Sequence, residues 1–349
     1  MDILASTPAA KPLEPVTVTG ARPGILSVRD GDGVEYVNLP AQPSVTFRVS
    51  GALGTHNVLN LDENGALVDS RTFHTACQTH IDDEGGRYGK LLQDLHMTMV
   101  NSSGGDGCTR MLVGNKMYRY FICWLRDHTH TMKGMKYFAD ELKTGLELYA
   151  DTQRGDGMVY DRIRYKANVQ GWRDYTFREG DFIKTLDADT AHPSTMQRIP
   201  VENDVEFLFL ECLYYTWKAT GDDAWMARYL DNAIKAVRYA TTDRYRWSER
   251  FKLLKRGYTI DTWDFIHRDD GELTLGDNVV DIDKTTFGVM HGDNTGMAVG
   301  CRYLAEMLRV AGREEEATPY ETLADDLLQR LEDVAWNGQF YTHHVSEDP

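Results

Sequence analysis

The sequence predicts a mainly α-helical fold, an (α/α)6 toroid, preceded by a small β-sandwich. Two observations lead to this prediction. Apolar residues fall in short runs over about the first 80 positions of the 349-residue chain and recur at helical spacing after residue 85. Two helical pairs in the second part share a spacing, and paired helices are what a double ring of helices requires. We therefore expect a β-sandwich domain at residues 1–82 and a toroid domain at residues 83–349.

The first domain is predicted from runs rich in Val, Ile, Thr and Tyr, which recur about every ten residues. Asn64-Gly65 separates two of these runs, and both residues tolerate the left-handed backbone of a tight hairpin turn. The pattern is typical of an immunoglobulin-like sandwich, for which we expect a structural role without chemistry. The expected strands lie at residues 16–19, 25–28, 34–39, 45–49, 58–61 and 67–73.

The helical part contains one segment that we expect to be surrounded by protein. A first helix is predicted to begin near His128, because apolar residues recur at helical spacing as far as Tyr149. The next, from Asp204 to about residue 219, is apolar in most directions and so belongs to an inner layer. It is expected to end at Gly221, and Asp222 is suited to cap the helix that follows.

A second helical pair repeats this arrangement. A helix over residues 294–310 is expected to stop at Gly312, and another helix carries Tyr320 and its apolar neighbours on one face. About six helices are clear after residue 85, whereas six hairpins hold twelve helices. The sequence also stops within what reads as an element near Val345. We therefore expect the toroid to be truncated at its C-terminal end.

Composition excludes several kinds of partner. The chain has 38 Lys and Arg against 54 Asp and Glu, and its net charge of -16 repels the phosphates of nucleic acids. No run reaches the roughly 18 apolar residues of a membrane helix, and the start does not resemble a signal peptide. We expect no membrane contact and a cytoplasmic location, without ruling out secretion. Oligomeric state is not predicted.

Neither a cofactor nor a metal is predicted. The five scattered cysteines suit free thiols better than a disulfide framework. Asp277, Asp281 and Asp283 lack the glycine and glutamate spacing of a calcium loop. No nucleotide-binding glycine motif or zinc motif is present.

Two acidic or aromatic segments before helices are candidates for sugar binding. In the first, Trp124 offers a flat apolar face to a sugar ring, while Arg126, Asp127 and His128 can bond its hydroxyls. An ion pair and a helix cap would explain the same residues equally well. In the second, the acids Glu202, Asp204 and Glu206 surround the start of the inner helix. The macrodipole explains one or two of them but does not require three, so we place Asp204 in a cavity, with Glu206 next.

A third segment, from Arg256 to Phe265, carries the expected catalytic acids. Asp261 and Asp264 lie three residues apart among aromatic residues, and desolvation of such a carboxyl raises its pKa toward that of a general acid. Trp263 is expected to stack under the sugar while Asp264 protonates the leaving oxygen. Asp261 holds a hydroxyl in this scheme or exchanges roles with Asp264.

A fourth segment, at Asp293 and Asn294, precedes another helix. Helix capping is the commoner use of such a pair, although a capping side chain can also line a cavity. We include both residues among the expected sugar contacts.

These segments together resemble the six-hairpin glycosidases, and most closely the amylo-1,6-glucosidase and glucosidase I branches. The resemblance covers roughly residues 110–345, and each motif is short, so their order along the chain carries it. The matching residues are Trp124, Arg126 and Asp127; Asp204 with Thr220, Gly221 and Asp222; Trp263 and Asp264; and Asp293 and Asn294 with Trp336 and Asn337.

The resemblance implies hydrolysis of a glycosidic bond with inversion, in which one carboxylic acid protonates the leaving oxygen and another activates water. The substrate would be an oligosaccharide or glycoside, with Asp264 as the acid and no cofactor. In those families the base lies near the end of the toroid, beyond the matched part. His128 and His130 after the Arg-Asp pair, and Asp261 beside Asp264, depart from the family pattern.

Two other functions remain open on the sequence alone. A sugar epimerase or isomerase on the same toroid would need His128, His130 or His291 in the cavity as acid or base. A non-catalytic carbohydrate-binding protein would keep the cavity but lack a competent pair of acids.

Overall fold

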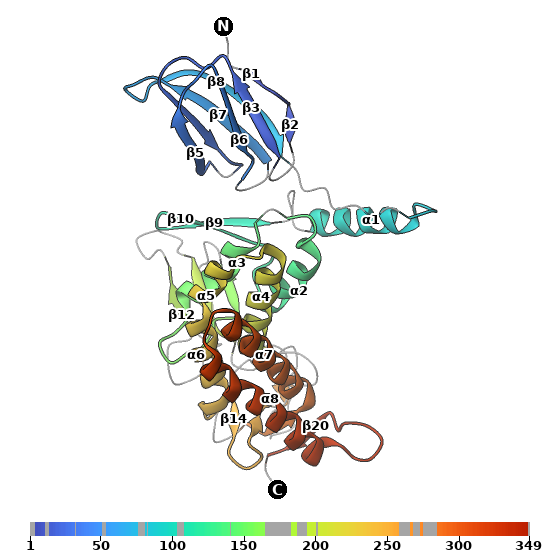
Figure 1. Ribbon diagram of the computed structural model, residues 1–349. Helices are drawn as coiled ribbons and strands as arrows, with labels where there is room; N and C mark the ends of the chain where they lie inside the picture. Colours follow the sequence, from blue (N-terminus) through green and yellow to red (C-terminus); the bar gives the residue numbers. More distant parts are fainter. Residues whose placement is uncertain are drawn as a thin grey trace. The chain divides into compact units, whose positions relative to one another are not determined.

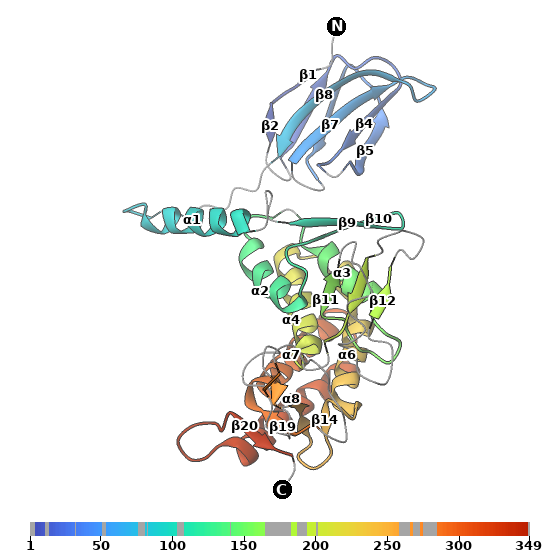
Figure 2. The same ribbon diagram turned by 180° about the vertical axis from the view of Figure 1, so that it is seen from behind.

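The computed structural model describes residues 4–10, 14–31, 33–50, 54–75, 81, 83–102, 108–139, 141–164, 183–186, 194–199, 202–257, 266–267, 273–274 and 285–347. The chain divides into two compact units (Figures 1 and 2). Unit 1 comprises Met1–Ser102 and Gly134–Glu141, and unit 2 comprises Ser103–Lys133 and Leu142–Pro349.

Unit 1 contains two sheets that share one hydrophobic core (Figure 1). Val16, Val18 and Phe47 of one sheet and Val28 and Phe73 of the other are buried in this core, because alternate side chains of each strand point inward. The first sheet has the order β1 (Leu4–Ala5), β3 (Pro15–Thr19), β6 (Ser44–Arg48); the second has β2 (Ala9–Ala10), β8 (Leu67–Thr75), β7 (Gly54–Leu61), β4 (Ile25–Arg29), β5 (Glu35–Pro40).

The connections in unit 1 follow the turn residues of the sequence. Gly65 has a φ of +81°, a left-handed conformation that closes the predicted hairpin between β7 and β8. Each of the six runs expected to be strands overlaps a strand of the structure, with bounds that differ by one residue at 34 and at 49. The helix of this unit, α1 (Arg87–Ser102), follows the second sheet in the chain.

Unit 2 mixes helices with short sheets. The inner helix α4 packs against α7, and α7 packs against α8, as both views show (Figures 1 and 2). The helices are α2 (Leu125–Met135, whose last two residues belong to unit 1), α3 (Lys143–Thr152), α4 (Val205–Thr220), α5 (Asp223–Arg228), α6 (Leu230–Thr242), α7 (His291–Val310) and α8 (Glu314–Ala335).

The strands of unit 2 form small sheets between these helices. The sheets are β9 (Thr109–Val113) with β10 (Lys116–Tyr120); β11 (Arg162–Arg164), β13 (Thr195–Gln197) and β12 (Ile183–Thr185); β14 (Trp247–Ser248) with β15 (Leu253–Leu254); β16 (Arg256–Gly257), β19 (Phe287–Met290) and β20 (His344–Ser346); and β17 (Ile266–His267) with β18 (Leu273–Thr274).

The predicted fold class is wrong. Helices hold 41% and strands 29% of the described residues, which contain eight helices, so the chain is not a mainly α-helical (α/α)6 toroid. Most strands of unit 2 have only two or three residues, too few to show an alternating pattern, and they were therefore interpreted as loops between helices.

The helix expected from His128 to Tyr149 is also wrong as a single element. It is two helices, α2 and α3, separated by residues 136–142. Gly134 lies at the end of α2, where its low helix propensity weakens the last turn. Phe138 N–H then donates to Met135 O (2.9 Å) in a turn that leaves the helix. Apolar spacing continued across this break and concealed it.

The inner helix α4 has the character that its sequence indicates. Leu208, Phe209, Leu210, Cys212 and Leu213 are all buried. Gly221 ends the helix with a φ of +64°, and the Asp222 side chain accepts from Trp225 N–H (2.9 Å) to cap α5. The expected end of α4 and the cap of the next helix are confirmed.

The contact between α4 and α7 depends on a glycine. A Cβ atom at Gly296 would lie 2.6 Å from the ring of Phe207, so only glycine lets the two helices approach at this point.

No helix among the described residues is both long and apolar enough to cross a membrane.

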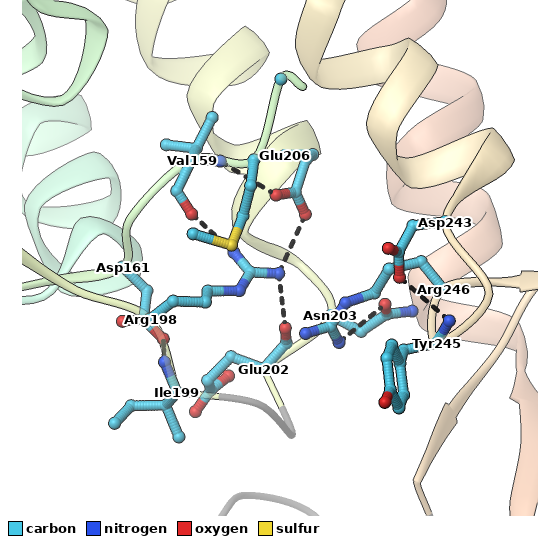
Figure 3. Close-up of polar contacts among 12 residues, drawn as sticks. Val159, Asp161, Arg198, Ile199, Glu202, Asn203, Glu206, Asp243, Tyr245 and Arg246 are labelled. Carbon is cyan, nitrogen blue, oxygen red and sulfur yellow. Dashed lines mark hydrogen bonds and ion pairs between the residues drawn. The ribbon is translucent and has the colours of Figure 1, made fainter. Parts of the chain in front are cut away.

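A fully buried ion pair joins α4 to the segment before it. Arg198 Nη2 lies 3.1 Å from Glu206 Oε2, and neither side chain is exposed to solvent. The guanidinium also donates to Val159 O (3.0 Å) and to Glu202 O (2.8 Å), and Val159 N–H donates to the Glu206 carboxylate (3.3 Å; Figure 3). A buried pair with these additional bonds fixes the start of α4 relative to residues 159 and 202.

We expect Glu206→Gln to destabilise unit 2 by about 3–5 kcal/mol, because it leaves the Arg198 charge buried without its partner. Urea unfolding followed by tryptophan fluorescence measures this, since all seven tryptophans lie in unit 2. The matched control is Glu306→Gln, which breaks the half-exposed pair with Lys218 and should cost at most about 1 kcal/mol. Equal losses in the two variants would contradict this role for the buried pair.

Candidate functional site

The site begins where two segments pair side by side. Leu125 N–H donates to Asp161 O (2.8 Å), and Ile163 N–H donates to Cys123 O (2.7 Å). Trp124 and Arg162 form an antiparallel bridge between these two bonds, with the Arg162 guanidinium 4.4 Å from the center of the Trp124 ring. The pairing places the start of α2 directly beside Asp161.

Asp161 is also tied to a third segment. Its N–H donates to Gln197 O (3.0 Å), and its side-chain Oδ2 accepts from Ile199 N–H (2.9 Å; Figure 3). Both backbone groups and one carboxyl oxygen of this residue are therefore used in holding the segments together. The other oxygen, Oδ1, is buried and has no hydrogen-bond partner among the described residues.

Arg126 connects α2 to the start of α4. Its Nε donates to Asp204 Oδ2 (2.5 Å), and its Nη2 pairs with Glu202 Oε2. One guanidinium thus binds two carboxylates that are 76 and 78 residues away in the chain. Such charge-assisted bonds are stronger and more directional than neutral hydrogen bonds.

These contacts surround a cavity of about 250 Å³ within unit 2. Four of the residues predicted to bind a sugar, from two distant segments, meet there. Its volume is that of a small ligand, and a Trp face beside several polar groups is a common lining for such a site. The lining residues are Trp124, Arg126, Asp127, Asp161, Glu202, Asp204 and Val205.

Two carboxyl groups of the cavity hold protons more tightly than usual. Burial raises the pKa of Asp161 to about 8, a shift that the nearby charge of Arg198 opposes. Burial, together with the negative charge of Asp204, raises the pKa of Glu202 to about 7, against the effect of Arg126. The cavity therefore contains groups that can hold and release protons near neutral pH.

Other predicted residues lie elsewhere. Glu206 is fully buried in its pair with Arg198 and does not line the cavity. His128 is buried against Phe121, and its Nδ1 accepts from Phe121 N–H (3.1 Å). Burial lowers the pKa of His128 to about 4. Neither His128 nor the exposed His130 lines the cavity. His291 lines a separate pocket beside Tyr341.

Asp293 and Asn294 are engaged within the protein. Asn294 binds the backbone of Leu254 through Leu254 N–H (2.7 Å) and Leu254 O (3.0 Å), so it holds β15 against α7. Asp293 accepts from Asn203 Nδ2 (3.1 Å) and lies 3.6 Å from Arg256. Asp293 is therefore linked to the acidic segment through Asn203.

The three residues expected to carry the chemistry, Asp261, Trp263 and Asp264, lie outside the described residues. Their predicted roles remain predictions. Arg256 lies five positions before Asp261 in the sequence, and its charge opposes the rise in the pKa of Glu202.

Sequence reasoning missed Asp161 and passed over Glu202. Asp161 follows the apolar run from Met158 to Tyr160, and an ionisable residue that directly follows a buried run could have signalled a site. Glu202 was recognised among the three acids but was not placed in the cavity, because nothing local indicates that Arg126 reaches it.

No protein-family model and no curated protein matches the chain. Among solved structures, it is similar to a GH78 family rhamnosidase of Bacillus sp. GL1, with a TM-score of 0.50 and 11% identity over 96% of this chain and 33% of that chain. At this identity the likeness concerns the fold, which is therefore similar to that of a glycoside hydrolase.

Two further similar structures are a rhamnosidase from Klebsiella oxytoca with rhamnose bound and an α-L-rhamnosidase from Dictyoglumus thermophilum. Their TM-scores are 0.43 and 0.44, with identities of 13% and 12% over 95% and 97% of this chain. They are matched over 64% and 37% of their own lengths. The chain thus spans less than two thirds of each of these three proteins.

We expect the stability of unit 2 to fall as pH rises from about 4.5 to about 7. Between about pH 4.5 and pH 7, Glu202 keeps a proton in the folded state that it releases in the unfolded state. The stabilisation that Glu202 gives the folded state is therefore complete at low pH and is lost as pH rises to its folded pKa of about 7. Each such group contributes at most about 1.4 kcal/mol per pH unit. Glu202→Gln should therefore flatten the dependence in this range, as measured by urea unfolding at several pH values.

The exposed Glu315 of α8 offers a control, because Glu315→Gln should leave the pH dependence as it is in the unaltered protein. If Glu202→Gln also left it unaltered, the raised pKa of Glu202 would be refuted.

Proposed function

We propose that the chain carries the sugar-binding part of the active site of a glycoside hydrolase. The observation that supports this most is the convergence of Trp124, Arg126, Asp127 and Asp204 on one cavity, together with the buried acid Asp161. An aromatic face and charged groups that both donate and accept are what binding of a polyhydroxylated ring needs. The fold similarity to a rhamnosidase agrees with this proposal.

In the proposed mechanism the sugar lies against Trp124 and its hydroxyls bind Asp127 and the pair formed by Arg126 and Asp204. Arg126 can bond a hydroxyl without changing its charge state, while the acids accept hydrogen bonds. The buried carboxyls of Asp161 and Glu202 complete the polar lining of the cavity. Polar groups that are already fixed by protein contacts need little reorganisation when a ligand binds.

The reaction we propose is hydrolysis with inversion of configuration. Asp264 protonates the leaving oxygen, assisted by Asp261, with Trp263 as a second stacking surface. A separate carboxylate activates water from the opposite side, and no residue of this chain is assigned to that role. The closer resemblance to amylo-1,6-glucosidase and glucosidase I remains a proposal about these motifs alone.

The cavity suits neutral sugars. Even when Asp161 is protonated, its lining holds three other acids and one cation, so a sugar acid would be repelled. We propose rhamnosides and glucosides as the first substrates to test: rhamnosides because of the fold similarity, and glucosides because of the motif resemblance.

The decisive experiment measures hydrolysis of a panel of nitrophenyl glycosides by the natural full-length protein. Asp264→Asn should reduce kcat by about 100-fold or more, the size of a general-acid contribution. Asp333→Asn, on the exposed face of α8, should have no effect. Unchanged turnover in Asp264→Asn would remove this assignment, and sugar binding without turnover would instead identify a carbohydrate-binding protein. Conversion of free sugars without hydrolysis would favour an epimerase.

Asp127→Asn tests the binding role separately. Asp127 is exposed at the cavity, so we expect the fold to stay intact while KM rises about tenfold or more, as for the loss of a hydrogen bond to a charged group. Asp326→Asn on α8 serves as a matched surface control. An unchanged KM for every hydrolysed glycoside would show that Asp127 does not contact the substrate.

A further inference from the structure

Asp161 has a carboxyl oxygen for which the described protein provides no partner. The residue is only 3% exposed, and it lines the cavity. Oδ2 is occupied by Ile199 N–H (2.9 Å), whereas Oδ1 has no hydrogen-bond partner among the described residues. A buried polar atom of this kind normally has a partner, and a ligand in the cavity would supply one.

Burial favours the neutral form of this carboxyl, whereas the nearby charge of Arg198 favours the ionised form. Arg126 is already bound to Glu202 and Asp204, and Arg198 is bound to Glu206. Ionised Asp161 would therefore add a further negative charge to a group of acids whose cations are committed to other carboxylates.

The groups that act on Asp161 come from several elements. They are Arg198 and Glu202 beyond β13, Asp204 at the start of α4, and Tyr149 of α3, with Arg126 and Asp127 of α2 across the cavity. Of these, Arg198 favours the charged form, and the acids Glu202 and Asp204 oppose it.

We propose that Asp161 is a specificity-determining residue that, as a neutral carboxylic acid, donates a hydrogen bond from Oδ1 to an oxygen of a sugar in the cavity. This inference rests on the proposed function. It assigns a donor to the lining of the cavity, in which the other acids can only accept hydrogen bonds when they are ionised. The donor does not transfer its proton, so its role is to position the sugar, distinct from that of the acid Asp264.

The position of Ile199 makes a sharp test possible. Because Ile199 N–H needs an acceptor, an asparagine at this position would turn its carbonyl oxygen toward Ile199 and its NH₂ group into the cavity. Asp161→Asn therefore imitates the neutral acid and keeps a donor at every pH. Asp161→Ala removes the donor, with folding checked by tryptophan fluorescence.

The experiment is titration calorimetry of L-rhamnose and D-glucose with the full-length protein at pH 6 and pH 9. Since the pKa of Asp161 is about 8, the unaltered protein should lose about tenfold in affinity between these values. Asp161→Asn should bind within about threefold of the unaltered protein at pH 6 and keep that affinity at pH 9. Asp161→Ala should bind at least about tenfold more weakly at both.

Glu202 also titrates near this range, so Glu202→Gln is measured in parallel and should retain the loss of affinity above pH 8. The inference would be overturned if Asp161→Asn still lost sugar affinity between pH 6 and pH 9. It would also be overturned if Asp161→Ala bound the sugars as tightly as the unaltered protein. In glycoside hydrolysis, we expect Asp161→Asn to change kcat by less than about threefold and to raise KM by no more than about threefold. A large loss of kcat would show that Asp161 transfers its proton, which contradicts a positioning role.

A second measurement requires no ligand. Carbon-13 NMR of aspartate carboxyl groups, with the Asp161 signal identified by its absence in Asp161→Asn, reports directly when this group ionises. Titration near pH 8 is expected, and titration in the ordinary range of aspartate would overturn the inference whatever the chain binds. Titration near pH 8 with no sugar bound by any variant would instead refute the proposed function and with it the sugar contact.

Discussion

The cavity depends on the hydrogen bonds that join three separate segments at Asp161. Leu125 N–H and Ile199 N–H both donate to this residue, which itself donates to Gln197 O. These bonds bring the start of α2 against the segment that precedes α4, and only then can Arg126 reach Glu202 and Asp204. The acids and the tryptophan of the site therefore share one location because the backbone of a single residue connects their segments.

The electrostatics of the site follow from this arrangement. Two cations lie nearby, yet the buried Arg198 neutralises Glu206 within the protein and the partly exposed Arg126 serves two carboxylates at once. The cavity keeps an excess of acid, and the least compensated group holds its proton into the alkaline range. Burial of an acid without a dedicated cation is unfavourable for a purely structural residue, and perturbed groups of this kind concentrate at functional sites.

Local signals in the sequence predicted local features well. The apolar character of α4, its end at Gly221 and the cap at Asp222 depend on neighbouring residues, and all are present. The convergence of Trp124, Arg126 and Asp204 could be anticipated because each precedes or opens a helix.

What could not be predicted depends on distant partners. Asp161 becomes buried only through residues 197–199, and Arg126 finds Glu202 across 76 residues of chain. Strands of two or three residues have no periodicity of their own, so the expected toroid took the place of mixed sheets and helices.

Asp161 directly precedes strand β11, and its carboxyl group accepts from Ile199 N–H (2.9 Å). It lies on the same side of its strand-like segment as Ile163, which is 2% exposed and part of the core. An aliphatic replacement would leave Ile199 N–H buried without its acceptor, at a cost of about 1–3 kcal/mol, so selection for thermal resistance alone would keep an oxygen-bearing side chain at this position.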